Sequence, residues 1–271
     1  MTRDQLIEQI RSKKSFLCIG LDPDFDRMPE VVKSDADPIF SFNKAIIDAT
    51  HDFCVAYKPN TAFYEARGLD GWRSLERTIQ YLNENYPNHF TIADAKRGDI
   101  GNTSRMYAEA FLERMGFDSI TVAPYMGSDS VGPFLSEGRG KWAIVLALTS
   151  NAGASDFQKQ KLGGDYLFEN VLRTTASWSN PDSLMFVVGA TQAESLREVR
   201  SIVPDHFLLV PGVGAQGGSL EEVVEHGANK DIGLLINSSR GILYAGSGDD
   251  FASKAREEAK KLALSMAIYC R

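Results

Sequence analysis

The sequence predicts an α/β protein that folds as a single (β/α)8 TIM barrel, and two observations carry this prediction. Eight short apolar segments alternate with helical stretches at similar spacing along 271 residues, which is typical of parallel βα units. Several of these segments end in charged or glycine-rich sequences, as expected where loops leave the mouth of a barrel. A doubly wound open sheet is the alternative, but it usually has fewer strands or an added domain.

The first half of the chain supplies a helix and four strands. Residues 1–14 have a charged helical pattern without the apolar core of a signal sequence. Four apolar runs are the expected strands, and the first three stop at a turn signal: 15–21, 53–57, 90–95 and 119–123. Helices are expected at 36–52, around 72–82, from an Asn102 cap through 111, and near 128–135.

The second half continues the same alternation. Further apolar strands are expected at 142–148, 184–188, 207–210 and 232–236. A polar loop at 150–164 precedes a helix that runs to 178, and later helices are expected at 192–203, 220–225 and 250–267. Because no linker, low-complexity tract or longer repeat interrupts this order, residues 1–271 are expected to form one TIM-barrel domain.

Composition predicts a sizeable apolar core and excludes several classes of partner. Hydrophobic residues make up 43% of the chain and charged residues 24%, which is ordinary for a globular protein. The net charge is -7 without a basic run, so nucleic acids and anionic membranes are poor candidate partners. Cys18, Cys54 and Cys270 show no disulfide or zinc pattern, and no apolar run approaches the ~20 residues of a membrane span. A reducing, cytoplasmic location is expected.

Opposite charges gather at the ends of the first three predicted strands. Asp22 ends the first and Lys58 the second, while Asp94 and Lys96 share one face of the third, about 7 Å apart along the backbone. Asp99 follows in the next turn. Such charges are costly unless they are paired or put to use. Alone, the cluster fits an ion-pair plug as well as catalysis, but its position at the catalytic end of a barrel favours a reactive site.

Glycine-rich loops follow the seventh and eighth predicted strands. Residues 211–218 read P-G-V-G-A-Q-G-G, and residues 237–241 read N-S-S-R-G. Free backbone N–H groups with Arg240 beside them predict a phosphate site in this class of barrel, whereas tight turns and a solvated arginine are the plainer alternative. The first loop also matches G-x-G-x-x-G, but no acidic residue ends the next strand, so a dinucleotide site is rejected.

Other catalytic and metal motifs receive little support. Four histidines fall at helix ends or before strands, away from the predicted mouth, and are expected to be exposed or to cap helices: His51, His89, His206 and His226. Asp22 and Asp94 could hold a magnesium ion, but the lysines beside them would compete for the carboxylates. A metal is therefore disfavoured.

The segment from Asp94 to Asp99 resembles the D-x-K-x-x-D signature of orotidine 5'-phosphate decarboxylases, in the form found in their longer bacterial branch. Lys58-Pro59-Asn60, Thr149-Ser150-Asn151 and the 211–218 loop are similar to the same branch at corresponding places, so the resemblance covers about residues 20–241. It implies a homodimeric barrel that converts orotidine 5'-monophosphate to UMP and CO2 in de novo pyrimidine biosynthesis, without a metal or organic cofactor.

The resemblance also implies roles for individual residues. Lys58, Asp94 and Lys96 would be catalytic, and Asp99 would reach in with Thr103 from the partner subunit. Substrate-binding roles are implied for Asp22, Thr103, Ser150, Pro211, Gln216, Ser239 and Arg240. Asn151-Ala152 replaces the His-Pro of shorter members, so the pyrimidine contacts of that loop are not carried over in detail.

The chemistry of this array suits such a reaction. Loss of CO2 leaves a carbanion at C6, and an ammonium beside that carbon can stabilise the charge and then donate its proton; Lys96 is the candidate. Repulsion between Asp94 and the substrate carboxylate would add about 4 kcal/mol at ~4 Å, or roughly three powers of ten in rate, which is too little alone.

Two alternative functions remain open. One is a Mg2+-dependent sugar-phosphate enzyme with the same motif, such as ketogulonate-phosphate decarboxylase or hexulose-phosphate synthase. The other is a non-catalytic barrel that binds a phosphorylated ligand.

Overall fold

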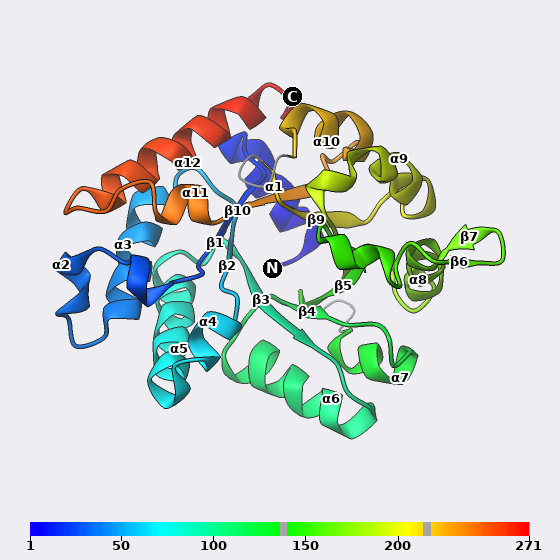
Figure 1. Ribbon diagram of the computed structural model, residues 1–271, viewed down its shortest axis with the longest axis horizontal. Helices are drawn as coiled ribbons and strands as arrows, with labels where there is room; N and C mark the ends of the chain where they lie inside the picture. The colour runs from blue at the N-terminus through cyan, green and yellow to red at the C-terminus, as the bar shows by residue number, and fades with distance from the viewer. Residues whose placement is uncertain (136–139, 214–217, 271) are drawn as a thin grey trace.

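The computed structural model describes residues 1–135, 140–213 and 218–270, and these contain a closed barrel of eight parallel strands surrounded by helices (Figure 1). The ring closes where β10 pairs with β1, with Leu17 beside Ile236. The TIM-barrel prediction is confirmed. The barrel strands are β1 (Leu17–Gly20), β2 (Ala56–Lys58), β3 (Phe90–Arg97), β4 (Ser119–Val122), β5 (Trp142–Leu148), β8 (Leu184–Val188), β9 (Phe207–Pro211) and β10 (Leu234–Ser238).

Helices follow the strands and cover the outside of the barrel (Figure 1). The longer ones are α1 (Arg3–Lys13), α3 (Pro38–Thr50), α5 (Gly68–Asn85), α6 (Gly101–Ala108), α8 (Leu167–Ala176), α9 (Ala193–Ile202), α10 (Leu220–Gly227) and α12 (Phe251–Ala267). The shorter ones are α2 (Glu30–Lys33), α4 (Ala62–Glu65), α7 (Ser128–Val131) and α11 (Arg240–Leu243). Within the described residues, none of these helices combines the length and apolarity needed to cross a membrane.

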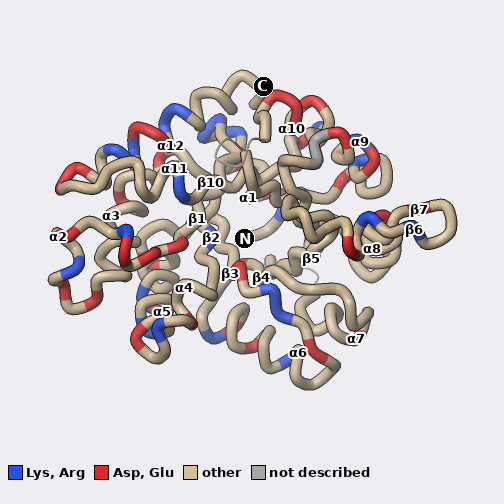
Figure 2. The backbone as a smooth tube through the Cα atoms, in the orientation of Figure 1, with Lys and Arg blue, Asp and Glu red and all other residues tan. Residues whose placement is uncertain are grey.

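The barrel strands are apolar on both faces because one face fills the barrel and the other packs under the helices. An aromatic group made of Phe90, Trp142 and Phe207 is fully buried, with ring centroids 5.9 Å apart for Phe90–Trp142 and 6.5 Å apart for Trp142–Phe207. The Trp142 Nε1–H donates to the Met1 carbonyl at 2.9 Å. These three strand residues therefore fill the barrel interior at its amino-terminal end. Figure 2 shows that most charged residues lie on the helices and loops, with a few beside β2 and β3 at the centre.

Several predicted boundaries need correction. β2 begins at Ala56 instead of residue 53, because the Phe53 N–H still donates to Thr50 and ends the preceding helix. Asn102 is not a helix cap, since α6 begins at Gly101 after an extended Ile100. The expected polar loop at 150–164 contains a 3-10 turn and part of the hairpin β6 (Lys161–Leu162) and β7 (Asp165–Tyr166). The Gly163-Gly164 pair is a recognised signal for such a two-residue turn.

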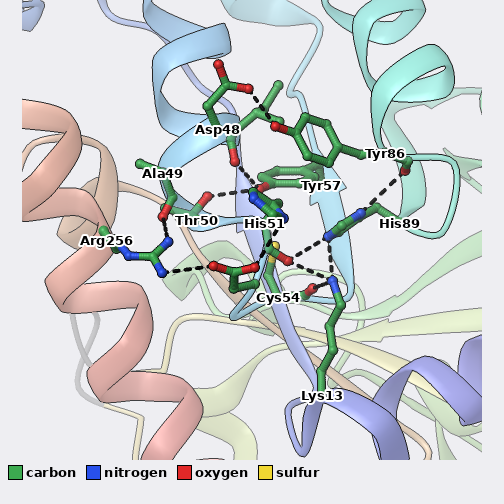
Figure 3. Close-up of polar contacts among 12 residues, drawn as sticks. Lys13, Asp48, Ala49, Thr50, His51, Cys54, Tyr57, Tyr86, His89 and Arg256 are labelled. Atoms are coloured by element: carbon green, nitrogen blue, oxygen red, sulfur yellow. Dashed lines mark hydrogen bonds and ion pairs between the residues drawn. The ribbon is translucent and has the colours of Figure 1, made fainter.

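A buried polar cluster lies at the amino-terminal ends of β2 and β3, opposite the charged strand ends (Figure 3). The Lys13 ammonium donates to the His51 carbonyl at 2.7 Å and the Cys54 carbonyl at 2.8 Å, and it lies 2.6 Å from His89 Nε2. These three acceptors use all three ammonium donors if His89 Nε2 is unprotonated. The Nδ1–H of His89 then donates to the Tyr86 carbonyl at 3.3 Å. His89 is therefore a neutral ligand of a buried lysine.

The expectation of exposed or capping histidines is wrong for His89 and His206, both of which are buried. Burial, with the charge of Lys13 adding to it, lowers the pKa of His89 to about 4. Burial and the neighbouring Arg200 lower the pKa of His206 to about 4 as well. Each histidine is surrounded by elements distant in sequence, which local composition does not reveal.

We expect His89 to make the folded protein sensitive to mild acid. The folded pKa of about 4 lies below the ordinary value near 6.5, so the unfolded chain binds a proton in this window and stability falls as the pH falls through it. At about pH 5 the loss from His89 is about 2 kcal/mol relative to neutral pH. His89→Gln removes the titration but keeps an acceptor for Lys13. Urea unfolding at both pH values should show a smaller acid loss in His89→Gln; equal losses would contradict the assignment. His206 is unchanged in both proteins, so its contribution to the acid loss is the same in each and does not affect the comparison.

Candidate active site

Asp94 lies at the centre of the charged cluster, between two ammonium groups. Its Oδ2 is 2.8 Å from Lys58 Nζ and its Oδ1 is 2.6 Å from Lys96 Nζ. Its backbone is also fixed, because the Asp94 N–H donates to the Pro59 carbonyl at 3.0 Å and the Asp94 carbonyl accepts from Thr61 at 3.2 Å. The ends of β2 and β3 therefore bring together the three residues that strand parity predicted to share one spot.

The three side chains differ in their exposure to solvent. Lys58 and Asp94 are 5% and 12% exposed, whereas Lys96 is 50% exposed. Burial alone would raise the pKa of Asp94, but the charges of Lys58 and Lys96 outweigh it and hold the pKa well below its usual range. Burial would likewise lower the pKa of Lys58, yet the carboxylates of Asp94 and Asp22 raise it above its ordinary value. At neutral pH, Lys58 and Asp94 are both charged.

Asp22 joins the loops at the ends of β1, β2 and β10. Its Oδ2 accepts from the Ser239 hydroxyl at 2.6 Å and its Oδ1 accepts from the Asn60 N–H at 3.2 Å. Gly20 makes this approach possible, because a Cβ there would lie 2.8 Å from the Ser239 Cβ. The Tyr244 hydroxyl donates to the Asp22 carbonyl at 3.0 Å. Asp22 and Ser239 are therefore brought together at the mouth, as their positions after neighbouring strands imply.

A pocket of about 310 Å³ opens beside Asp22. Asp22, Pro211, Ser239 and Arg240 line it, so four of the predicted binding residues share one cavity. Arg27 and Tyr244, which the sequence did not single out, also line it, together with Asp24 and Phe63. Gly212 also lines it and has a φ of +100°, which requires glycine at this turn. Asp22 lines the pocket, and its charge also raises the Lys58 pKa. Gln216 lies outside the described residues.

Three other predicted residues lie on other segments, after β3, on α6 and after β5. Asp99 follows β3, and its Oδ1 accepts from the Ile100 N–H at 2.7 Å. Thr103 is exposed on α6. Ser150 follows β5 and packs against Gly189, where an added Cβ would lie 2.7 Å from the Ser150 Cβ. The described residues also contain no group of three or more histidine, cysteine or acidic side chains arranged to hold a metal ion.

The sequence interpretation missed Thr121, which contacts the cluster directly. Its Oγ1 donates to Asp94 Oδ1 at 3.1 Å and accepts from the Lys96 N–H at 2.9 Å. A signal was present, because Thr121 is a polar residue inside the apolar run of β4. Asn60 was part of a segment that carries the resemblance, but its contact with Asp22 is made by the backbone N–H, which a side-chain pattern does not indicate.

Comparisons with known proteins agree with this geometry. Residues 15–255 match the family model described as Orotidine 5'-phosphate decarboxylase / HUMPS family. Orotidine 5'-phosphate decarboxylase from Flavobacterium johnsoniae is 63% identical over 267 residues, covering 98% of this chain and 97% of that protein. The Bacteroides fragilis protein of the same name is 57% identical over 268 residues, covering 98% and 97%. The structure of Leishmania donovani OMP decarboxylase is 35% identical with a TM-score of 0.81, covering 97% of this chain and 99% of that one. This chain therefore belongs to the orotidine 5'-phosphate decarboxylase / HUMPS family.

Proposed function

We propose that this chain removes CO2 from orotidine 5'-monophosphate to give UMP, with Lys96 as the proton donor to C6 of the pyrimidine. The relatives described above bear the name of this activity, which belongs to pyrimidine biosynthesis. The observation that carries the mechanism is the Asp94 carboxylate held between the ammonium groups of Lys58 and Lys96, at 2.8 and 2.6 Å. This array can stabilise a carbanion without a cofactor.

Lys96 is the residue suited to proton transfer. It is half exposed at the mouth of the barrel, whereas Lys58 is buried behind Asp94. Lys58 is balanced by the carboxylates of Asp94 and Asp22, so the exposed ammonium of Lys96 is the cation placed to attract the carboxylate of the substrate. As the C–CO2 bond breaks, the ammonium of Lys96 stabilises the electron pair left on C6 and then donates a proton to it. Asp94 disfavours the departing carboxylate by repulsion, which contributes only part of the rate.

The pocket beside Asp22 is the proposed site for the ribose and phosphate. Asp22 accepts hydrogen bonds at the mouth and is placed to accept them from ribose hydroxyls. Pro211 and Gly212 bring the backbone of one loop to the pocket, and Arg240 supplies a cation from the loop after β10. Gln216 belongs to the first of these loops and would complete the phosphate contacts. Binding energy from this remote phosphate can be used to close the site around the reacting carbon.

We also propose a homodimer in which Asp99 and Thr103 complete the site of the partner subunit. Both residues lie beside exposed apolar side chains of the same segment, Ile100 at 62% and Met106 at 50% exposure. Tyr125, at 94% exposure, lies before α7, which packs beside α6. Several exposed apolar side chains on neighbouring segments are typical of a protein interface. An interface here would bring Asp99 of one subunit close to Lys96 of the other. The Lys96 ammonium, which pairs with Asp94 within its own chain, would then gain a second carboxylate.

The proposed function also includes a role for Ser150, the domain organisation and the location of the protein. Ser150, in the loop after β5, is proposed to contact the pyrimidine. Residues 1–271 are proposed to act as one domain, because pairing of β1 with β10 closes a single barrel. A cytoplasmic location is also proposed. No metal or organic cofactor is included in the proposed reaction.

The first test is conversion of orotidine 5'-monophosphate, followed by UV absorbance with and without EDTA. We expect rapid formation of UMP at the same rate in both samples, because the electron pair is stabilised by Lys96. A rate abolished by EDTA and restored by Mg2+ would favour the sugar-phosphate enzymes of this family. Absence of conversion by folded, dimeric protein would contradict the function, and binding of UMP alone would then favour a non-catalytic role.

Replacing Lys96 tests the proton donor. We expect Lys96→Ala to lower kcat by at least about a thousandfold, since it removes the group that stabilises charge in the transition state. UMP binding should persist, because the pocket residues are untouched. Lys161→Ala, on the exposed hairpin β6–β7 that projects at the outer edge of the molecule (Figure 1), is the matched control and should keep the original kcat. Turnover near the original rate in Lys96→Ala would remove Lys96 from the mechanism.

Replacing Arg240 tests the phosphate site. Loss of a charge-assisted hydrogen bond should raise KM for orotidine 5'-monophosphate by about 10- to 100-fold in Arg240→Ala, with a smaller change in kcat. Orotidine, which lacks the phosphate, should react equally slowly with both proteins. An unchanged KM for the phosphorylated substrate would place the phosphate elsewhere.

A further inference from the structure

Strand β3 is irregular at the catalytic motif, opposite a single residue of β4. Ala93 pairs with Ile120 and Arg97 pairs with Val122, so residues 94–96 of β3 face only Thr121. Such a bulge re-aims the side chains it contains. Here it contains both Asp94 and Lys96, so the direction of the catalytic side chains depends on how the bulge is held.

The backbone of Lys96 has a conformation that needs support from its surroundings. Its φ is +48°, in the left-handed region that residues other than glycine rarely adopt. Such conformations persist where the surrounding structure fixes them, and they concentrate at functional sites. The Lys96 N–H, displaced from regular pairing by the bulge, donates to the Thr121 hydroxyl at 2.9 Å. The side chain of Thr121 thus replaces a backbone acceptor at the strained residue.

The same hydroxyl also holds the carboxylate. Thr121 Oγ1 donates to Asp94 Oδ1 at 3.1 Å, and that oxygen also accepts from Lys96 Nζ at 2.6 Å. Thr121 is 1% exposed and lies in a barrel strand, and its β-branched side chain has few accessible rotamers. One rigid hydroxyl therefore connects the backbone of Lys96 to the partner of its ammonium group.

We propose that Thr121 is a positioning residue for the decarboxylation: it holds the Lys96 backbone and the Asp94 carboxylate so that the Lys96 ammonium points at C6. This inference rests on the proposed function. Thr121 acts through Asp94 and Lys96 and takes no part in proton transfer. A shift of about 1 Å in a positioned group can lower a rate about 100-fold, so the loss of this hydroxyl should appear in kcat.

Ser119 provides a matched control on the same strand. It lies two residues before Thr121, on the same face, and is fully buried. Its hydroxyl donates to the Thr91 carbonyl at 3.1 Å, farther from the mouth and away from Asp94 and Lys96. Removing a buried hydroxyl at Ser119 therefore reproduces the structural cost of removing one at Thr121, without the contact to the site.

The experiment compares Thr121→Val, Thr121→Ser and Ser119→Ala in the full-length chain. Thr121→Val has nearly the same shape but lacks the hydroxyl, and we expect kcat to fall by about 10- to 100-fold. KM for orotidine 5'-monophosphate and Kd for UMP should change by less than about threefold, because their phosphate and ribose contacts come from other loops. Thr121→Ser keeps the hydroxyl and should keep kcat within about fivefold. Ser119→Ala should keep the original kcat even if it melts earlier.

The outcomes distinguish the role of the Thr121 hydroxyl from the proposed decarboxylase function. Original kcat in Thr121→Val, or a Thr121→Ser variant as impaired as Thr121→Val, would overturn the role of the hydroxyl. If Thr121→Val fails to fold, as shown by the loss of a cooperative unfolding transition in circular dichroism, the smaller Thr121→Ala takes its place under the same criterion; a folded variant that no longer binds UMP would contradict the positioning role. An original protein that binds UMP but leaves orotidine 5'-monophosphate unchanged would overturn the proposed function and this inference with it.

Discussion

The Asp94 carboxylate between two ammonium groups is the interaction on which the candidate site depends. A buried carboxylate with one partner removed would leave an uncompensated charge, which typically costs about 3–5 kcal/mol. Here each oxygen accepts from a different lysine, and Oδ1 also accepts from Thr121. The charges are therefore fixed before any substrate arrives. Because such an array needs little reorganisation during the reaction, it can stabilise developing charge more effectively than mobile water.

The lysines at the two ends of the barrel differ in exposure and in hydrogen-bond partners, and this difference bears on function. At the amino-terminal end, Lys13 is surrounded by two carbonyls and a neutral histidine, so its donors are satisfied (Figure 3). At the mouth, Lys96 is half exposed, has a left-handed backbone and donates to a carboxylate that Lys58 also needs. A cluster that served stability alone would not retain strain and an open charge. The mouth therefore fits a reactive site better than an ion-pair plug.

Much of the fold and the centre of the site could be predicted because the relevant signals are local. β5 and β8 have the predicted bounds, since their apolar runs end abruptly. Lys58, Asp94 and Lys96 meet because strand parity and the parallel order of β2 and β3 determine which side chains share a face. Asp22 and Ser239 meet because β1 and β10 are neighbours in a closed barrel. These inferences need only strand order and periodicity.

Features that depend on irregular backbone or on distant segments were missed. Parity assumes a regular strand, so it could not reveal the bulge in β3 that brings Asp94 and the Lys96 N–H to the Thr121 hydroxyl. The burial of His89 depends on Lys13 from α1, which nothing in the residues around His89 indicates. The proposed role of Asp99 and Thr103 involves a second subunit, which strand order and periodicity within one chain do not describe.

The most direct test of the account is hydrogen exchange at C6 of a product analogue in D2O. A 5-fluorinated UMP is suitable because its substituent acidifies the neighbouring C6–H, and it has no carboxylate on which Asp94 could act. The exchange therefore isolates carbanion stabilisation and proton transfer by Lys96. The account predicts that the original protein accelerates exchange of this hydrogen, as followed by NMR, and that Lys96→Ala does not exceed the rate in buffer. Equal exchange by the two proteins would contradict the central role of Lys96.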